Sequence, residues 1–326
     1  MRDVRTDVKN KSFAPVYLIF GEEAYIRKNY RNQLTSALVA PGDSLNYTAF
    51  SGNDIDAGEV VSLAMTMPFM AEKRVICVKD SGFFKKSAED IADYLENPSP
   101  DTVLIFDESA VDKKTRTYKA AKKAGFDVEA QSLKGKKLQD WVAANFKRNG
   151  KLVKEETVKL LIDRVSGDLS TLDAEISKLS SYAGDRESVS SEDVMLLVPR
   201  SPSYNVYQMI EAIGNKKVNL AVGIYYDMMV EKQNAYGVFS LIASHFRRML
   251  VVSDMGARGA GLQEIMDELG LADWQVNKYI TQARKFTRAK MVRAIEECVR
   301  APREIFQGKI QEEAAMELLI IGVASE

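Results

Sequence analysis

Short apolar runs within the first 135 residues are the feature that most constrains the fold. Three of them are almost purely apolar: Val16–Phe20, Val75–Val78 and Val103–Phe106. Strands covered by helices on both faces have this composition. Tyr47–Phe50 and Phe126–Ala130 are weaker, alternating runs that we expect as flanking strands. Because helix-like stretches separate the runs, the pattern predicts βαβ units and a parallel sheet.

Beyond residue 135 the strand pattern disappears and helical periodicity takes over. The first apolar stripe consists of Leu138, Trp141, Val142 and Phe146. Ser190 with Asp193 resembles a helix capping box, and the segment VPRSPSYN, with two prolines and two serines, predicts a linker. We therefore expect an α/β domain followed by two all-α domains, at residues 1–135, 136–202 and 203–326.

The first strand runs into a glycine and then a predicted helix, which is the layout of the phosphate-binding P-loop, G-x-x-x-x-G-K-[ST]. The eight residues from Gly21 are GEEAYIRK, and only this first glycine fits. Ile26 stands where the second glycine belongs, Arg27 where the lysine belongs and Lys28 where the hydroxyl belongs. We interpret the segment as a degenerate P-loop.

Acidic side chains also disfavour a nucleotide. Glu22 and Glu23 lie where an anion would sit, and like charges 4 Å apart repel by roughly 4 kcal/mol at an effective dielectric of ~20. Asp107 and Glu108 resemble a Walker B ending, but without a P-loop there is no Mg·ATP for them to bind. The single histidine, His245, falls on an apolar helical face and is expected to be packed or partly exposed there. We therefore expect no cofactor, no metal and no catalysis.

Charge, cysteine count and the length of apolar runs exclude several classes of protein. Lys and Arg number 45 against 46 Asp and Glu, so any nucleic-acid contact must come from local clusters. Two such clusters exist, with nine basic and two acidic residues over 113–137 and nine and three over 278–309. Cys77 and Cys298 are too few for a disulfide framework. Since no apolar run approaches the ~20 residues of a membrane span and the polar N-terminus lacks a signal-peptide core, we expect a cytosolic protein without membrane contact.

An apolar pair falls at a predicted tip between a helix and a strand. Pro68 disfavours helical geometry at Met67, and the next strand does not begin until Arg74. Phe69 and Met70 therefore lie between the two elements. If exposed, they would fit an apolar pocket of a partner, each burial contributing about 1.5–3 kcal/mol. The alternative, slightly favoured by the pattern alone, is that they fold back over the sheet edge.

Five blocks, in this order, resemble the delta subunit of the bacterial DNA polymerase III clamp loader. They are PVYLIFGEEAYIRKN, MTMPFMAEKRVICVKD, SYNVYQMIEAIGNKK, LGLADWQVNKYITQARKFT and EIFQGKIQEEAAMELLIIGVA. The resemblance implies an AAA+-like α/β domain, a helical lid domain and a helical collar domain. It also implies clamp binding through two adjacent hydrophobic tip residues, here Phe69 and Met70 flanked by Met67 and Pro68. The family often has leucine or a second aromatic where Met70 stands.

The resemblance further implies a non-catalytic role and a set of partners. These are the sliding clamp (the beta subunit), the tau/gamma and delta-prime loader subunits through the collar, and primer–template DNA, in the bacterial cytoplasm at the nucleoid. A loader encircling DNA needs cations facing phosphates, and Lys285, Arg288 and Lys309 are candidates. Two alternatives stay open: an AAA+-type ATP-binding protein with an unusual phosphate loop, and a helical scaffold that binds neither clamp nor DNA.

Overall fold

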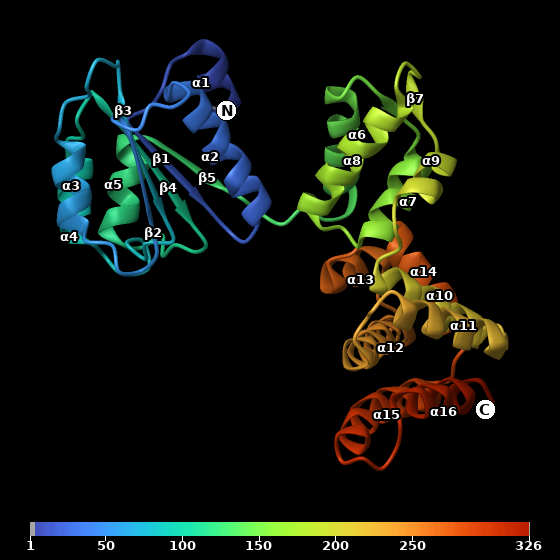
Figure 1. Cartoon of the computed structure of the whole chain (residues 1–326). Coiled ribbons are helices and arrows are strands. Elements are labelled where there is room, and N and C mark those ends of the chain that lie inside the picture. The colour runs from blue at the N-terminus through green and yellow to red at the C-terminus, as the bar shows by residue number, and fades with distance from the viewer. Residues whose placement is uncertain (1–3, 326) are drawn as a thin grey trace. The chain divides into compact units, whose positions relative to one another are not determined.

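A computed structural model describes residues 4–325 of the chain (Figure 1). It divides into two compact units, Met1–Leu133 and Lys134–Glu326. The expected combination of a parallel α/β domain with all-α structure is confirmed. The further division of the helical part near residue 202 stays a prediction. Within residues 4–325 there is no helix with the length and apolar character needed to cross a membrane.

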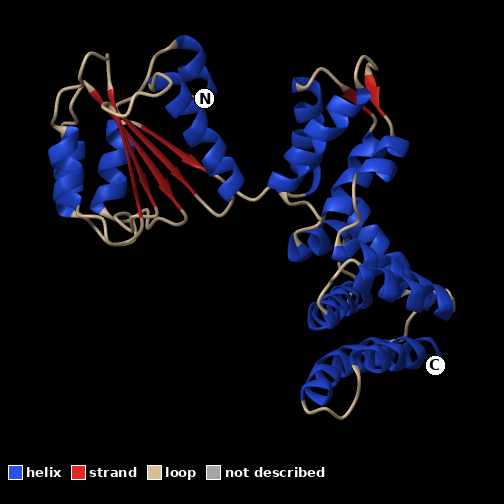
Figure 2. Ribbon diagram, in the orientation of Figure 1, coloured by secondary structure: helices blue, strands red, loops and turns tan. Residues whose placement is uncertain are grey.

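The first unit is built on a parallel five-stranded sheet (Figure 2). Its spatial order is β2-β3-β4-β1-β5. The bounds are β1 Val16–Phe20, β2 Tyr47–Ser51, β3 Arg74–Lys79, β4 Thr102–Glu108 and β5 Phe126–Glu129. The three purely apolar runs form the inner strands and the two weaker runs form the edges. This is the expected result, because inner strands between helical layers have no solvent-facing side.

Helices cover both faces of this sheet, and alternate residues of β1 enter two separate cores (Figure 1). Tyr17 and Ile19 pack on the side of α1 and α2, whereas Leu18 packs on the side of α3, α4 and α5. The alternation follows from the two-residue period of a strand. The helices are α1 Val4–Asn10, α2 Ala24–Leu38, α3 Ala57–Ala64, α4 Glu89–Glu96 and α5 Arg116–Ala124.

The second unit is almost entirely helical. Its helices are α6 Gly135–Arg148, α7 Glu155–Val165, α8 Leu169–Ala183, α9 Ser191–Leu197, α10 Pro202–Gly214, α11 Val218–Val230, α12 Ala235–Ala257, α13 Leu262–Leu269, α14 Asp273–Ala283, α15 Arg288–Phe306 and α16 Glu312–Ser325. The expected absence of strands beyond residue 135 is wrong, because β6 Leu152–Val153 and β7 Ser188–Val189 form a small parallel sheet. Two residues per strand are too few to leave a periodic pattern.

Two local predictions in this unit have different outcomes. The capping box is confirmed, because Ser190 accepts from the Asp193 N–H at 3.2 Å while the Asp193 carboxylate accepts from the Ser190 N–H at 2.9 Å. The predicted linker VPRSPSYN is wrong in its second half, since α10 begins at Pro202. Ser201 caps this helix, and proline is favoured at the first helical position because its missing N–H would have no intrahelical partner there.

Candidate functional site

The loop between α3 and β3, residues 65–73, is the tip loop. Asp56 caps the start of α3 by accepting from the Gly58 N–H at 2.8 Å, and the helix ends at Ala64. Beyond it, Met67 is 78% exposed, Phe69 60% and Met70 94%. Pro68 is half-buried between them. The apolar pair therefore does not fold back over the sheet edge, and the backbone that carries it needs another means of support.

One buried side chain holds the first half of the tip loop. Arg74, the first residue of β3, donates to the carbonyl oxygens of Thr66 at 3.1 Å, Met67 at 3.1 Å and Leu45 at 3.2 Å. The planar guanidinium fork can serve several acceptors at once, which a lysine ammonium does less well. Because the same group binds Leu45 and Met67, the segment before β2 lies beside the tip loop.

A second buried side chain, Asn46, holds the middle of the loop. Its amide oxygen accepts from the Phe69 N–H at 2.6 Å, and its amide nitrogen donates to the Phe69 carbonyl at 2.9 Å. The same nitrogen donates to Asp43 at 2.8 Å, and this hydrogen bond lowers the pKa of Asp43. Directly after Phe69, Met70 has a left-handed backbone with φ 52°, a conformation uncommon for any residue other than glycine.

Although the backbone of the tip loop is anchored, apolar side chains on and beside this loop are exposed. This tip surface is defined by Leu45, Met65, Met67, Phe69 and Met70, each at least 60% exposed. Its aromatic ring and unbranched thioethers suit an apolar pocket of another protein, because methionine adapts to irregular cavities. Four residues of this site were not predicted from the sequence: Leu45, Asn46, Met65 and Arg74. The available signal was a charged residue, Arg74, directly before the apolar run Val75–Val78 of β3.

The degenerate P-loop lies at the end of β1, and two of its backbone donors are bound to carbonyl oxygens of the chain. Gly21 has φ 127°, and a Cβ there would lie 2.5 Å from the carbonyl oxygen of Ala130. The Gly21 N–H donates to the Glu108 carbonyl and the Glu23 N–H to the Ala130 carbonyl, both at 3.1 Å. The glycine is therefore required by a close backbone approach. A functional P-loop directs such N–H groups at phosphate instead.

An ion pair lies where a nucleotide site would need free groups. Arg27 is buried and donates to Asp107 at 2.6 Å, while Arg31 donates to the other Asp107 oxygen at 2.5 Å. Glu108 is fully buried and accepts from the Ser81 N–H at 3.0 Å. Burial raises the pKa of Glu108. Both strand-end acids are thus satisfied by protein groups.

The other two positions of the degenerate loop contribute nothing to a phosphate cradle. Ile26 is half-buried and Lys28 is exposed, both on α2.

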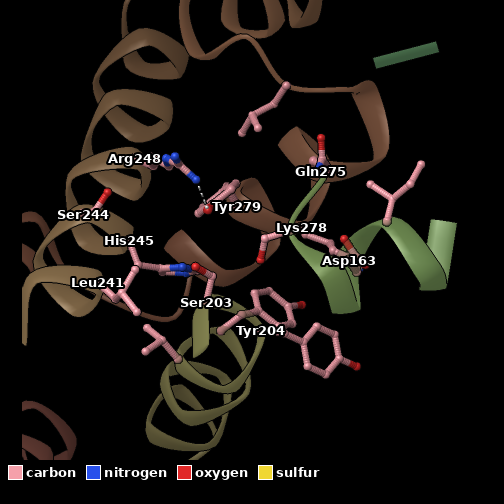
Figure 3. A pocket seen from close by; sticks show the side chains of 15 residues that line it. Asp163, Ser203, Tyr204, Leu241, Ser244, His245, Arg248, Gln275, Lys278 and Tyr279 are labelled. Carbon is pink, nitrogen blue, oxygen red and sulfur yellow. Dashed lines mark hydrogen bonds and ion pairs between the residues drawn. The ribbon is translucent and has the colours of Figure 1, made fainter. Parts of the chain in front are cut away.

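The second unit contains a cavity of about 320 Å³ beside His245 (Figure 3). The His245 Nε2–H donates to the Gln282 side-chain oxygen at 2.5 Å, and the Gln282 amide nitrogen donates to the Tyr207 carbonyl at 3.1 Å. The ring lies 4.8 Å from that of Tyr279. Burial lowers the pKa of His245 to about 4. Of the two expectations for His245, packed or partly exposed, the structure shows the packed one, and with this pKa the ring is neutral at physiological pH.

On another wall of the cavity, an ion pair joins α14 to α7. Lys278 pairs with Asp163, and its ammonium lies 4.9 Å from the Trp274 ring centroid and 5.5 Å from that of Tyr207. Burial raises the pKa of Asp163. Because Lys278 and Asp163 pair with each other, these two charges connect α14 to α7.

Two of the three DNA candidates have acidic partners. Lys285 pairs with Glu211, and the Nε of Arg288 lies 3.2 Å from Asp254. Lys309 is exposed in the turn between α15 and α16. Their contact with DNA stays a prediction.

Several apolar side chains are exposed near the C-terminal end of the described residues. Phe306 is 87% exposed, Val299 65% and Leu318 62%, all on α15 or α16. Val299 and Phe306 are seven positions apart, which places them on one face of α15.

Comparison with known proteins gives consistent results over nearly the whole chain. A family described as DNA polymerase III, delta subunit, matches residues 17–131, and its C-terminal domain family matches residues 203–323. The DNA polymerase III subunit delta of Bacillus subtilis (strain 168) is 28% identical, covering 98% of this chain and 95% of that protein. A probable DNA polymerase III subunit delta of Aquifex aeolicus is 22% identical, covering 78% and 75%. The solved structure of a Bacillus subtilis DNA clamp loader delta protein superposes with a TM-score of 0.75 at 27% identity, covering 99% of both chains.

Proposed function

Since this chain belongs to the DNA polymerase III delta subunit family, we propose that its tip surface binds the ring-shaped sliding clamp and opens the ring, or holds it open, for loading onto primed DNA. The observation that carries the proposal is the exposure of Phe69 and Met70 on a backbone fixed by Asn46 and Arg74. A loop already held in one conformation loses less entropy on binding, so more of the apolar burial contributes to affinity.

Ring opening needs no chemistry in this chain. If the tip surface binds more tightly when a neighbouring clamp interface is distorted, it shifts the clamp toward the open state by that difference in affinity and no more. We infer that the chain has no ATPase activity of its own, because Arg27 pairs with Asp107 and the N–H groups of Gly21 and Glu23 bind carbonyls. ATP-driven work then falls to the tau/gamma subunits.

The remaining partners would bind the second unit. Exposed apolar side chains of α15 and α16 support assembly with tau/gamma and delta-prime. For primer–template DNA, Lys309 is the simplest of the three candidates, because Lys285 and Arg288 would first have to leave Glu211 and Asp254. Loading would take place in the bacterial cytoplasm, at the nucleoid.

A clamp-binding measurement with a matched control tests the main proposal. The Phe69→Asp, Met70→Asp variant should lose binding to immobilised sliding clamp in surface plasmon resonance. The control is Met195→Asp, Leu196→Asp, an adjacent pair on α9 whose residues are 53% and 69% exposed. Equal affinity of the tip variant and the control would refute the proposal.

A separate titration tests the ATP-binding alternative. Isothermal calorimetry with Mg·ATP should show no saturable heat at micromolar nucleotide. Saturable binding would favour an ATP-binding protein with an unusual loop.

A further inference from the structure

Within residues 4–325, exposed methionines are concentrated in one place. Twelve methionines lie within residues 4–325, and only four of these twelve are more than half exposed. Three of the four are in the tip loop: Met65 at 66%, Met67 at 78% and Met70 at 94%. The fourth is Met195 on α9, at 53%. The other eight are buried or half-buried, so a reagent in solution reaches the tip methionines and Met195 before these eight.

The tip methionines stay exposed because the backbone beneath them is anchored. Arg74 binds the carbonyl of Met67 itself, and Asn46 binds both backbone groups of Phe69, the neighbour of Met70. Met65 is the C-terminal cap of α3, hydrogen-bonded through its N–H to Val61 at 3.0 Å. These hydrogen bonds hold the backbone at or beside the three methionines, whose side chains are exposed to solvent.

We propose that the tip loop is a reversible oxidation site, at which a peroxide converts Met65, Met67 and Met70 to methionine sulfoxide and thereby weakens clamp binding. The inference rests on the proposed function of the tip surface. In the reaction, a sulfur lone pair attacks one oxygen of hydrogen peroxide, and the S–O bond forms as the O–O bond breaks. The departing hydroxide takes up the proton of the transferred oxygen and leaves as water. The sulfur loses two electrons, which reduce the peroxide, and the sulfoxide can be reduced again by methionine sulfoxide reductases.

The sulfoxide changes the property on which the tip surface depends. Thioethers are apolar and bind apolar pockets, whereas a sulfoxide oxygen is a polar acceptor that loses its water on binding. An apolar pocket offers it no donor, so affinity should fall by about tenfold or more for a sulfoxide that becomes buried. The aromatic ring of Phe69 is unchanged, so binding should be weakened, not abolished.

The test uses the full chain and hydrogen peroxide. The protein is treated alone and the peroxide removed, so that the clamp is never exposed. Peptide mass spectrometry then locates the sulfoxides, and surface plasmon resonance gives the clamp affinity before treatment, after treatment and after incubation with the reductases. We expect sulfoxides at the tip methionines and Met195 ahead of buried ones such as Met209, an affinity loss of about tenfold or more, and recovery on reduction.

Two variants assign the loss to particular residues. Met195→Leu removes the exposed methionine outside the tip and should lose affinity on oxidation as the wild type does. Met65→Leu, Met67→Leu, Met70→Leu should show the same affinity before and after peroxide, measured against its own starting value. Unchanged affinity of a chain with oxidised tip methionines, or an equal loss in the triple-leucine variant, would overturn this inference alone. No binding by the untreated wild type would overturn the proposed function together with it.

Discussion

Asn46 binds the backbone of Phe69 at both of its polar groups, accepting from the N–H at 2.6 Å and donating to the carbonyl at 2.9 Å. Asn46 directly precedes β2, while Phe69 lies in the tip loop before β3, and these two strands are neighbours in the sheet. The sheet edge thus fixes the position of the aromatic side chain that we propose enters the clamp.

Removing this anchor should affect both loop order and binding. We expect Asn46→Ala to lower the free energy of unfolding by about 1–3 kcal/mol, because the amide is buried and two backbone groups lose a partner. Hydrogen exchange at residues 66–70 should become faster, and clamp affinity should fall. If Asn46 acts through Phe69, the affinity losses of Asn46→Ala and Phe69→Ala will be less than additive in the double variant. Additive losses together with unchanged exchange would contradict this role.

Substitutions of Met70 should have separate effects on stability and on clamp binding. Its left-handed backbone costs roughly 1–2 kcal/mol for a residue with a Cβ. We therefore expect Met70→Gly to be more stable than Met70→Ala by about 1 kcal/mol, after allowing for the greater freedom of glycine in the unfolded chain. Both variants should bind the clamp more weakly than the wild type, since both lack the thioether. Thermal unfolding and clamp titrations of the pair measure the two effects, and a less stable glycine variant would disprove the backbone argument.

How far the sequence predicted this molecule depended on the range of the contacts involved. The inner strands were predictable because burial on both faces leaves a continuous apolar run, as at Val16–Phe20. The exposure of Phe69 was not, since it depends on side chains 23 residues before it and five after it, Asn46 and Arg74. A pattern read along the chain contains no such contacts. Clamp binding by Phe69 and Met70 stays a prediction.

The same limit applies to the degenerate P-loop. The wrong residue types at Ile26, Arg27 and Lys28 were evident from the motif, but the pairing of Arg27 with Asp107 joins positions 80 residues apart. The close approach of Ala130 to Gly21 is also a long-range contact. The motif therefore indicated that the phosphate site was degenerate, and only the structure identified the groups that occupy it.

The buried ion pair predicts how this unit responds to loss of one partner. We expect Arg27→Met to lower the free energy of unfolding by roughly 3 kcal/mol, since Asp107 stays buried with Arg31 as its remaining close partner. The double variant Arg27→Met, Asp107→Leu should recover part of this loss, because it removes the buried charge as well. Urea unfolding measures both. If the double variant loses more free energy of unfolding than the two single variants lose in sum, the pairing is contradicted.

His245 should make stability depend on pH in a defined window. Its pKa is about 4 in the folded chain and 6.5 ordinarily, so between these values the unfolded chain binds a proton that the folded chain does not. Above about pH 6.5, His245 therefore does not change the stability. As pH falls from 6.5 to 4, the free energy of unfolding falls by about 3 kcal/mol in total, and below pH 4 this group causes no further loss. The His245→Gln variant cannot take up that proton. As pH falls from 7 to 4.5, its free energy of unfolding should therefore rise relative to that of the wild type. Urea denaturation of both proteins at each pH measures the difference. A difference that stays constant over this range would show that His245 is not held neutral by burial.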